Sequence, residues 1–187
     1  MILHKTDEKA ASLCIDFLKR GKILILPTDT VYGFSAIVES DEKTFRTEEK
    51  IRAIKGREER KPFIRLIASP DEIRRYARDT VPASLLAKWP GALTIIVNDR
   101  AGGTAAYRCP GDAWLRNIIS ESGPVYSTSV NKSGKPALEK ISDIIETFED
   151  DVDLIISSGD TAGVLPSTLV DISSGALRVL RQGAVHV

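Results

Sequence analysis

Two short polar segments each follow an apolar run that is typical of a buried strand, and a third begins a strand. They are PTDTVYGF at residues 27–34, STSVNKSG at residues 127–134 and PSTLVD at residues 166–171. Ligands of open α/β sheets lie beyond strand ends, so hydroxyl, amide and carboxylate groups at these places could orient a polar ligand. Taken singly, each segment is explained better as a capped or hydrophilic turn whose side chains bond their own backbone.

A basic segment lies between the first two of these. Residues 52–65 contain two acidic side chains and six basic ones, namely Arg52, Lys55, Arg57, Arg60, Lys61 and Arg65. A loop through Gly56 would let Lys55 and Arg57 point at one anion, and arginine offers a planar fork that suits phosphate or carboxylate. A charge run is more often a solvated loop, so this segment alone does not decide for a site.

The overall charge argues against a protein that binds nucleic acid mainly by electrostatics. The 187 residues carry 26 Lys and Arg against 26 Asp and Glu, which gives a net formal charge of zero. The distribution is uneven, because residues 141–160 hold seven acids and no base and so offset the basic segment. A local anion site is therefore compatible with a neutral chain.

Several common site motifs are missing from the sequence. It contains no GxxxxGK[ST] or GxGxxG phosphate loop and no GxSxG nucleophile turn. Its cysteines and histidines, Cys14, Cys109, His4 and His186, have none of the spacings of zinc ligands. We expect no metal site built by the chain, and an ATP-using enzyme with this sequence would need another phosphate cradle.

Helix and strand patterns alternate along the chain. Apolar residues recur at helical spacing over residues 10–18, with Thr6 as the expected cap, and again over 114–119 and 143–148. Short apolar runs predict strands over residues 23–26, 31–38, 63–68, 93–97, 125–128, 154–156, 169–172 and 177–180. This irregular alternation predicts an α/β fold with a twisted, mixed open sheet flanked by helices.

The sequence predicts a single domain over residues 1–187, since we find neither a repeat nor a low-complexity linker. No apolar run approaches the roughly 18 residues of a membrane helix. The first eleven residues lack the apolar core of a signal peptide. We therefore expect a cytoplasmic protein without a membrane partner.

Taken in order, the polar segments resemble those of one family. The blocks PTDTVYGF, KGR with a later KP, WPGALT, RCP, STSVNKSG, PSTLVD and LRQG resemble the YrdC-like threonylcarbamoyl-AMP synthases over residues 21–183. The resemblance implies that fold. It also implies the condensation of L-threonine, bicarbonate or CO₂ and ATP, with release of diphosphate, for the threonylcarbamoyl modification of adenosine 37 in tRNA.

The resemblance also implies roles for individual residues. The family signature is Lys-x-Arg plus Ser-x-Asn. The residues that match it, and that the resemblance implies to be catalytic, are Lys55, Arg57, Ser129 and Asn131. ATP would be bound by Arg57, Lys61, Thr104, Ser129, Asn131 and Arg181. Threonine would be held by Thr30, Arg108 and Ser167, with Arg108 as the partner of its carboxylate.

The chain departs from the family pattern at several positions. Asp29 replaces a usual Glu, and Leu66 stands near the position where some members carry a His that helps to hold threonine. Phe34 and Val130 are bulkier than the usual residues, which leaves the exact substrate open. None of these changes removes a signature residue.

The implied reaction needs positioned substrates and neutralised phosphate charge rather than a nucleophile or a metal cage. Mg²⁺ would arrive with ATP. Further expected partners are tRNA or double-stranded RNA and the complex that transfers the threonylcarbamoyl group. Two alternatives stay open: a paralogue that carbamoylates another acceptor, and a double-stranded RNA-binding or ribosome-maturation factor without catalysis.

Overall fold

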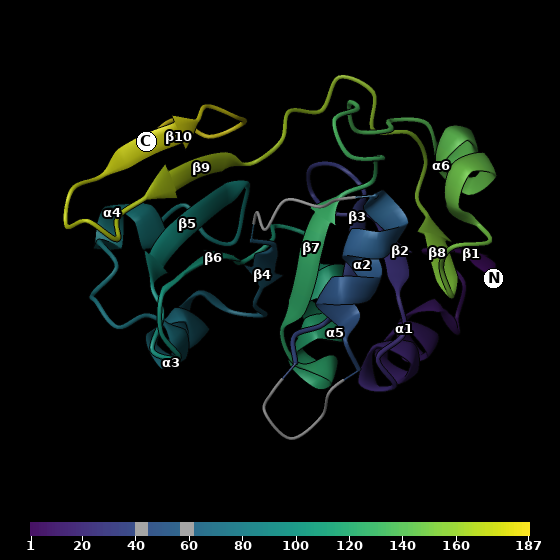
Figure 1. Ribbon diagram of the computed structural model, residues 1–187, viewed down its shortest axis with the longest axis horizontal. Coiled ribbons are helices and arrows are strands. Elements are labelled where there is room, and N and C mark those ends of the chain that lie inside the picture. The colour runs from purple at the N-terminus through teal and green to yellow at the C-terminus, as the bar shows by residue number, and fades with distance from the viewer. Residues whose placement is uncertain (40–44, 57–61) are drawn as a thin grey trace.

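The computed structural model describes residues 1–39, 45–56 and 62–187. Within these residues ten strands form one mixed sheet in the order β1-β8-β2-β3-β7-β4-β6-β5-β9-β10 (Figure 1). The strands are β1 (Ile2–His4), β2 (Leu24–Leu26), β3 (Gly33–Ile37), β4 (Ile64–Leu66), β5 (Leu93–Asn98), β6 (Thr104–Arg108), β7 (Val125–Ser129), β8 (Leu154–Ser157), β9 (Thr168–Asp171) and β10 (Arg178–Arg181). The sheet is mixed because β2, for example, pairs parallel with β8 and antiparallel with β3. The predicted α/β class and mixed open sheet are confirmed.

Helices cover both faces of the half of the sheet around β2. These are α1 (Ala10–Lys19) and α5 (Ala113–Ser122) on one face, and α2 (Thr47–Lys55) and α6 (Ile141–Phe148) on the other. Side chains alternate along a strand, so Leu24 and Leu26 pack against α1 and α5 while Ile25 packs on the opposite face. A strand buried on both faces needs such a continuous apolar run.

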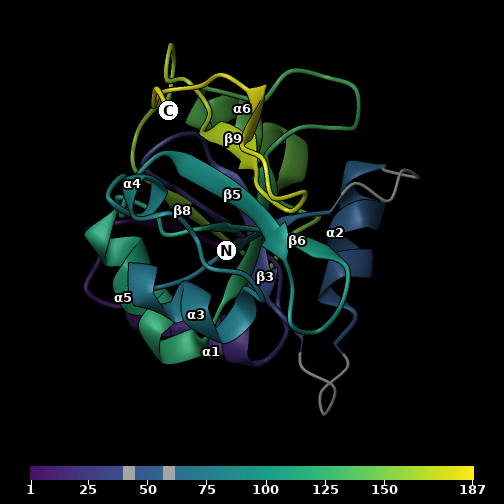
Figure 2. The ribbon, with the colours of Figure 1, turned by 90° about the vertical axis from the view of Figure 1, so that its left-hand side faces the viewer.

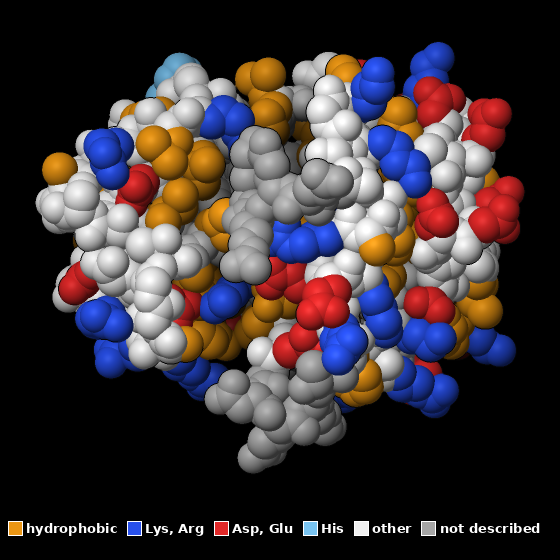
Figure 3. All heavy atoms as spheres, in the orientation of Figure 1, with side chains coloured by type: hydrophobic (Ala, Val, Ile, Leu, Met, Phe, Trp, Pro, Cys, Tyr) orange, Lys and Arg blue, Asp and Glu red, His pale blue; other side chains and the backbone are white. Residues whose placement is uncertain are grey.

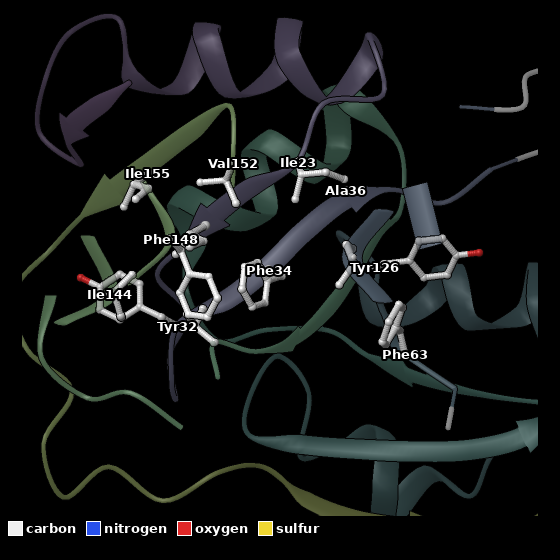
Figure 4. Packing of buried hydrophobic residues seen from close by; sticks show 13 residues of the cluster. Ile23, Tyr32, Phe34, Ala36, Phe63, Tyr126, Ile144, Phe148, Val152 and Ile155 are labelled. Atoms are coloured by element: carbon white, nitrogen blue, oxygen red, sulfur yellow. The ribbon is translucent and has the colours of Figure 1, made fainter. Parts of the chain in front are cut away.

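The core on the α6 face is centred on an aromatic pair. The rings of Phe34 and Phe148 meet edge to face, with centroids 5.0 Å apart, and Figure 4 shows them between Tyr32, Val152 and Ile155. Both rings are fully buried. Val130 belongs to the same cluster.

The other half of the sheet has its own core. The short helices α3 (Ile73–Tyr76) and α4 (Ala83–Leu86) pack against one face of β5, β6 and β9. The 3₁₀ turn η1 (Pro70–Glu72) leads into α3. Figure 2 shows these strands with α3 and α4 beside them. The opposite face of the same strands is free to line a site.

Two strands and one cap differ from the sequence-based prediction. Strand β6 was not predicted, since its sequence TAAYR holds small and polar residues rather than an apolar run, and β1 was also missed. Thr6 does not cap α1, because its hydroxyl contacts Nδ1 of His4 at 2.7 Å and the helix begins at Ala10. Of the helices described, none is both long and apolar enough to cross a bilayer.

Candidate active site

The free face of the sheet encloses a cavity of about 450 Å³, a volume in the range of small-molecule sites. Its wall takes residues from seven consecutive strands of the sheet, in the order β3-β7-β4-β6-β5-β9-β10. Strands lie about 4.8 Å apart, so in a flat sheet the outer two would be roughly 29 Å apart. Both border the same cavity, so the sheet curls around it. The lining residues used below are Thr30, Arg108, Ser129, Ser167, Leu169 and Arg181.

The register of the strands explains which side chains face the cavity. Ile64 of β4 pairs with Ala106 of β6, which pairs with Ile96 of β5. Residues paired across strands point to the same face, and all three line the cavity. Arg108 lies two positions beyond Ala106 and therefore points the same way. The apolar strand residues form the base of the cavity beneath the polar groups.

Arg108 is held at one end of the cavity by neighbouring groups. Its guanidinium donates from Nη1 to Oγ1 of Thr30 at 2.9 Å, from Nη2 to Oδ1 of Asp29 at 2.7 Å and from Nε to the carbonyl of Gly91 at 3.0 Å. Burial lowers the pKa of Arg108 from its ordinary value, and the charge of Asp29 opposes that effect. The result is a fixed, charged fork that suits a carboxylate.

Ser167 joins Arg108's side of the cavity to Arg181. The Ser167 hydroxyl lies 2.8 Å from Oγ1 of Thr94 and accepts from Nη2 of Arg181 at 3.3 Å. Arg181 also donates to the carbonyl of Ser167 from Nε at 3.1 Å and from Nη2 at 2.9 Å. Burial and then the charge of Arg108 lower the pKa of Arg181, so the two guanidinium groups lie within electrostatic reach.

Lys55, Ser129 and Asn131 form a second polar cluster at the end of β7. The buried Lys55 ammonium donates to the carbonyl of Ser129 and to Oδ1 of Asn131, the latter at 2.9 Å. The Ser129 hydroxyl donates to the same Oδ1 at 2.7 Å. The Asn131 amide group donates onward to the carbonyls of Lys132 at 2.9 Å and Lys135 at 2.7 Å. These contacts fix the loop after β7 beside the cavity.

The structure brings together most of the residues that the sequence singled out. Thr30, Arg108, Ser129, Ser167 and Arg181 line one cavity, and Lys55 and Asn131 bond to Ser129 or its loop. Arg57 and Lys61 lie outside the described residues. Thr104 is exposed at the far end of β6, on the face of Ala106 and Arg108 but beyond the cavity wall.

Three further positions differ from what the sequence suggested. Phe34 and Val130, whose bulk left the substrate open, are fully buried in the core on the α6 side and do not line the cavity. Thr94 lies in the strand predicted over residues 93–97 and was given no role in a site, but its buried hydroxyl contacts Ser167. The signal for Thr94 was a threonine among apolar residues of a predicted core strand, since a buried hydroxyl needs a partner.

Comparison with known proteins agrees with this geometry. A family model with the description "Telomere recombination", that of the Sua5/YciO/YrdC domain, matches residues 16–183. The chain belongs to this family. The matched span contains every residue of the cavity wall named above.

Curated relatives of this Sua5/YciO/YrdC chain carry one name. A threonylcarbamoyl-AMP synthase of Pyrococcus abyssi is 30% identical over 98% of this chain and 57% of its own length. Proteins of that name from Bacillus subtilis and Chromohalobacter salexigens are each 27% identical, over 96% and 92% of this chain and 55% and 97% of their own lengths. The chain thus spans little more than half of the first and second of these relatives.

Solved structures of Sua5/YciO/YrdC proteins share the fold. P. abyssi Sua5, crystallised with L-threonine, superposes with a TM-score of 0.85 at 28% identity, covering 98% of this chain and 57% of that one. YciO of E. coli has a TM-score of 0.83 at 22% identity, covering 100% of this chain and 95% of that one. The second likeness concerns the fold alone.

Proposed function

We propose that the chain is an L-threonylcarbamoyladenylate synthase. It would condense L-threonine, bicarbonate or CO₂ and ATP, release diphosphate and supply the threonylcarbamoyl group for adenosine 37 of tRNA. The observation that carries the proposal is the convergence of Thr30, Arg108 and Ser167 in one cavity, since these positions come from three distant parts of the chain. The threonine in the related P. abyssi Sua5 crystal supports the same reading.

Threonine would bind at the Arg108 end. Two of Arg108's nitrogens already donate to Thr30 and Asp29, and each terminal nitrogen carries a second N–H that can point to a carboxylate. The hydroxyls of Thr30 and Ser167 could take the amine or the hydroxyl of the ligand. The chain's task here is to orient the amine for its reaction with CO₂.

ATP would bind along the wall formed by Ser129 and Arg181. Lys55, Ser129, Asn131 and Arg181 offer cationic and hydrogen-bonding groups there, and Arg57, Lys61 and Thr104 remain proposed contacts. The threonine amine first adds to CO₂, losing a proton, to give a carbamate. A carbamate oxygen then attacks the α-phosphorus in line, and the bond to the bridging oxygen breaks as diphosphate leaves. Positioning and charge neutralisation supply the rate enhancement.

Mg²⁺ would enter with ATP and offset the charge of the leaving diphosphate. Among the described residues no group of three or more His, Cys, Asp or Glu side chains could hold a metal. A site that receives its ion already bound to phosphate needs few protein ligands, so the residues present fit such an ion.

Threonine-dependent diphosphate release tests the proposal. Purified chain with ATP, Mg²⁺ and bicarbonate should release diphosphate only when L-threonine is added, and the product should be threonylcarbamoyl adenylate by mass spectrometry. Release with a different amino acid would favour the paralogue. Absence of release with every amino acid, together with RNA binding that Ser129→Ala leaves unchanged, would overturn the synthase and favour an RNA-binding factor.

A further inference from the structure

Thr168, the first residue of β9, makes an unusual set of contacts for a strand residue. Its side chain is fully buried. Its hydroxyl accepts from the backbone N–H of Gly183 at 3.0 Å and of Val185 at 3.1 Å, and donates to the carbonyl of Val185 at 2.5 Å. A threonine hydroxyl has one donor and two acceptor lone pairs, so these contacts use its full capacity. We call this set of contacts the Thr168 clasp.

The clasp is supported by a close approach of two chain segments. Gly183 packs so tightly that a Cβ added there would lie 2.2 Å from the carbonyl oxygen of Pro166 and 2.6 Å from the carbonyl carbon of Ser167. The N–H of Ala184 donates to the same Pro166 carbonyl at 3.1 Å. Residues 183–185 therefore lie directly against residues 166–168, which is possible only for glycine at 183.

The strand just before the clasp is an edge strand that β9 holds on one side, by backbone pairing and by the ion pair of Arg178 with Asp171. Strand β10 stands at the end of the sheet order, and all four of its residues are exposed. Its pairing with β9 is irregular, with a register shift between Val179 and Arg181. Edge strands with few buried contacts open at low free-energy cost. The ordering of the chain on both sides of Arg181 thus depends on β9 and on the clasp.

This arrangement places Arg181 at the wall of the cavity. It lies two residues before Gly183, and its guanidinium spans the carbonyl and hydroxyl of Ser167, the neighbour of Thr168. We propose that Thr168 is a positioning residue for the nucleotide side of the site: its clasp fixes residues 182–185 and thereby holds Arg181 at the cavity wall. This inference rests on the proposed function in assigning Arg181 to ATP.

A purely structural role for Thr168 makes a different prediction. If the clasp served only the stability of the fold, its loss would weaken ATP and threonine binding to a similar degree. If it positions Arg181, ATP binding should suffer much more, because threonine keeps Arg108 and the Ser167 hydroxyl remains bonded to Thr94. The ratio of the two affinity losses therefore separates the roles.

The experiment compares Thr168→Val, which keeps the shape and removes the hydroxyl, with Thr168→Ser, which keeps the hydroxyl. Thr147→Val is the matched control, since that hydroxyl is exposed on α6 and donates to the carbonyl of Asp143. Calorimetry would give the Kd of ATP and of L-threonine separately. Hydrogen exchange at residues 182–187 and tryptic cleavage after Arg178 and Arg181 report the clasp without any ligand.

Thr168→Val should raise the Kd of ATP about tenfold and that of threonine less than about threefold, as expected when a fixed charged contact is lost. It should also speed exchange and cleavage of the C-terminal segment, while Thr168→Ser and Thr147→Val behave like the parent. Gly183→Ala, which breaks the clasp from the other side, should reproduce the effect if Thr168→Val folds poorly.

Unchanged exchange and cleavage in Thr168→Val would overturn the clasp itself. Equal losses for ATP and threonine would overturn the positioning role and leave a structural one. If the parent chain binds no ATP, the proposed function and the positioning role both fail, whereas exchange and cleavage still decide on the clasp.

Discussion

Arg108 and Asp29 form an ion pair at one end of the cavity, with Nη2 of Arg108 2.7 Å from Oδ1 of Asp29 and side-chain exposures of 5% and 20%. Gly111 belongs to this arrangement, because a Cβ at that position would lie 2.8 Å from Oδ2 of Asp29. These neighbouring groups leave the Arg108 guanidinium little freedom to change its orientation. A preorganised fork of this kind loses less entropy when it binds a carboxylate.

Arg108→Lys should weaken threonine binding by about tenfold or more, because an ammonium cannot keep the contacts to Thr30 and Gly91 while also facing a carboxylate. ATP binding should change little. Calorimetry with each ligand measures both effects. Arg178→Lys is the control, since Arg178 pairs with Asp171 at 3.1 Å but is largely exposed. Threonine affinity equal to that of the parent would show that Arg108 does not hold the carboxylate.

Lys55→Met should abolish most of the activity, by about a hundredfold, because the loss of the ammonium removes a preorganised charge and releases the loop that carries Asn131. Three acceptors on Ser129 and Asn131 would lose the ammonium as a donor, although Oδ1 of Asn131 would keep the Ser129 hydroxyl. The free energy of unfolding should therefore fall by about 1–3 kcal/mol. Threonine-dependent diphosphate release and denaturant unfolding measure the two effects.

Lys132→Met is the matched control for Lys55. Lys132 lies in the loop after β7 that Lys55 contacts, but its ammonium is half exposed and contacts the carbonyl of Ile54 at 2.9 Å and Asp151 at 3.3 Å. We expect nearly full activity from this variant. A comparable loss in both variants would indicate that positive charge near this loop supports activity in general, whatever the position of the lysine.

Local patterns predicted most of the elements of this fold. The apolar stripe of α5 and its end at Gly123 follow from sequence, and the structure adds Asp112 as the cap that accepts from the N–H groups of Trp114 and Leu115. Strand β6 could not be predicted in the same way, because its sequence TAAYR holds no apolar run and its place depends on β4 and β5 on either side. Whether such a segment forms a strand depends more on the strands it pairs with than on its own β-propensity.

The site was predictable as a set of segments but not as a geometry. Thr30 and Arg108 are 78 positions apart, and their contact depends on the strand order and on the curl of the sheet, which no local pattern contains. The same limit explains Phe34, which lies in β3, and Val130, which follows β7: whether such a residue faces the cavity or the core depends on a register of one residue. The Asp29–Arg108 pair was missed for the same reason.

Ser167 should couple the two substrates, because it touches Arg181 on one side and shares the cavity with Arg108 on the other. ATP should change the Kd of threonine, and threonine should change the Kd of ATP by the same factor, as linkage requires. Ser167→Ala should bring this factor close to one and weaken threonine binding about fivefold. Calorimetric titrations in both orders measure the factor. Ser120→Ala, an exposed change on α5, should keep it, and an undiminished factor in Ser167→Ala would rule out this route of coupling.

The two cysteines should make the fold sensitive to alkali. Both thiols are buried and free, and burial raises the pKa of Cys14 to about 12 and that of Cys109 to about 11. An unfolded cysteine ionises near pH 8.5. Because the folded-state pKa values are raised, this contribution to stability is complete below about pH 8.5 and is lost as the pH rises towards 11.

Urea unfolding at pH 8, 9, 10 and 11 should therefore show a falling midpoint, and Cys109→Ala should reduce the slope of this fall between about pH 9 and 11. The substitution also removes a contact from the Cys109 thiol to the carbonyl of Ala68, so its midpoint at pH 8 should already be lower. A thiol reagent should react with neither cysteine of the folded parent at pH 8, because the thiolate is depleted and inaccessible. Equal slopes in parent and variant would mean that the alkaline loss comes from other groups, such as the Tyr107 phenol, whose pKa is raised by burial and by Asp99.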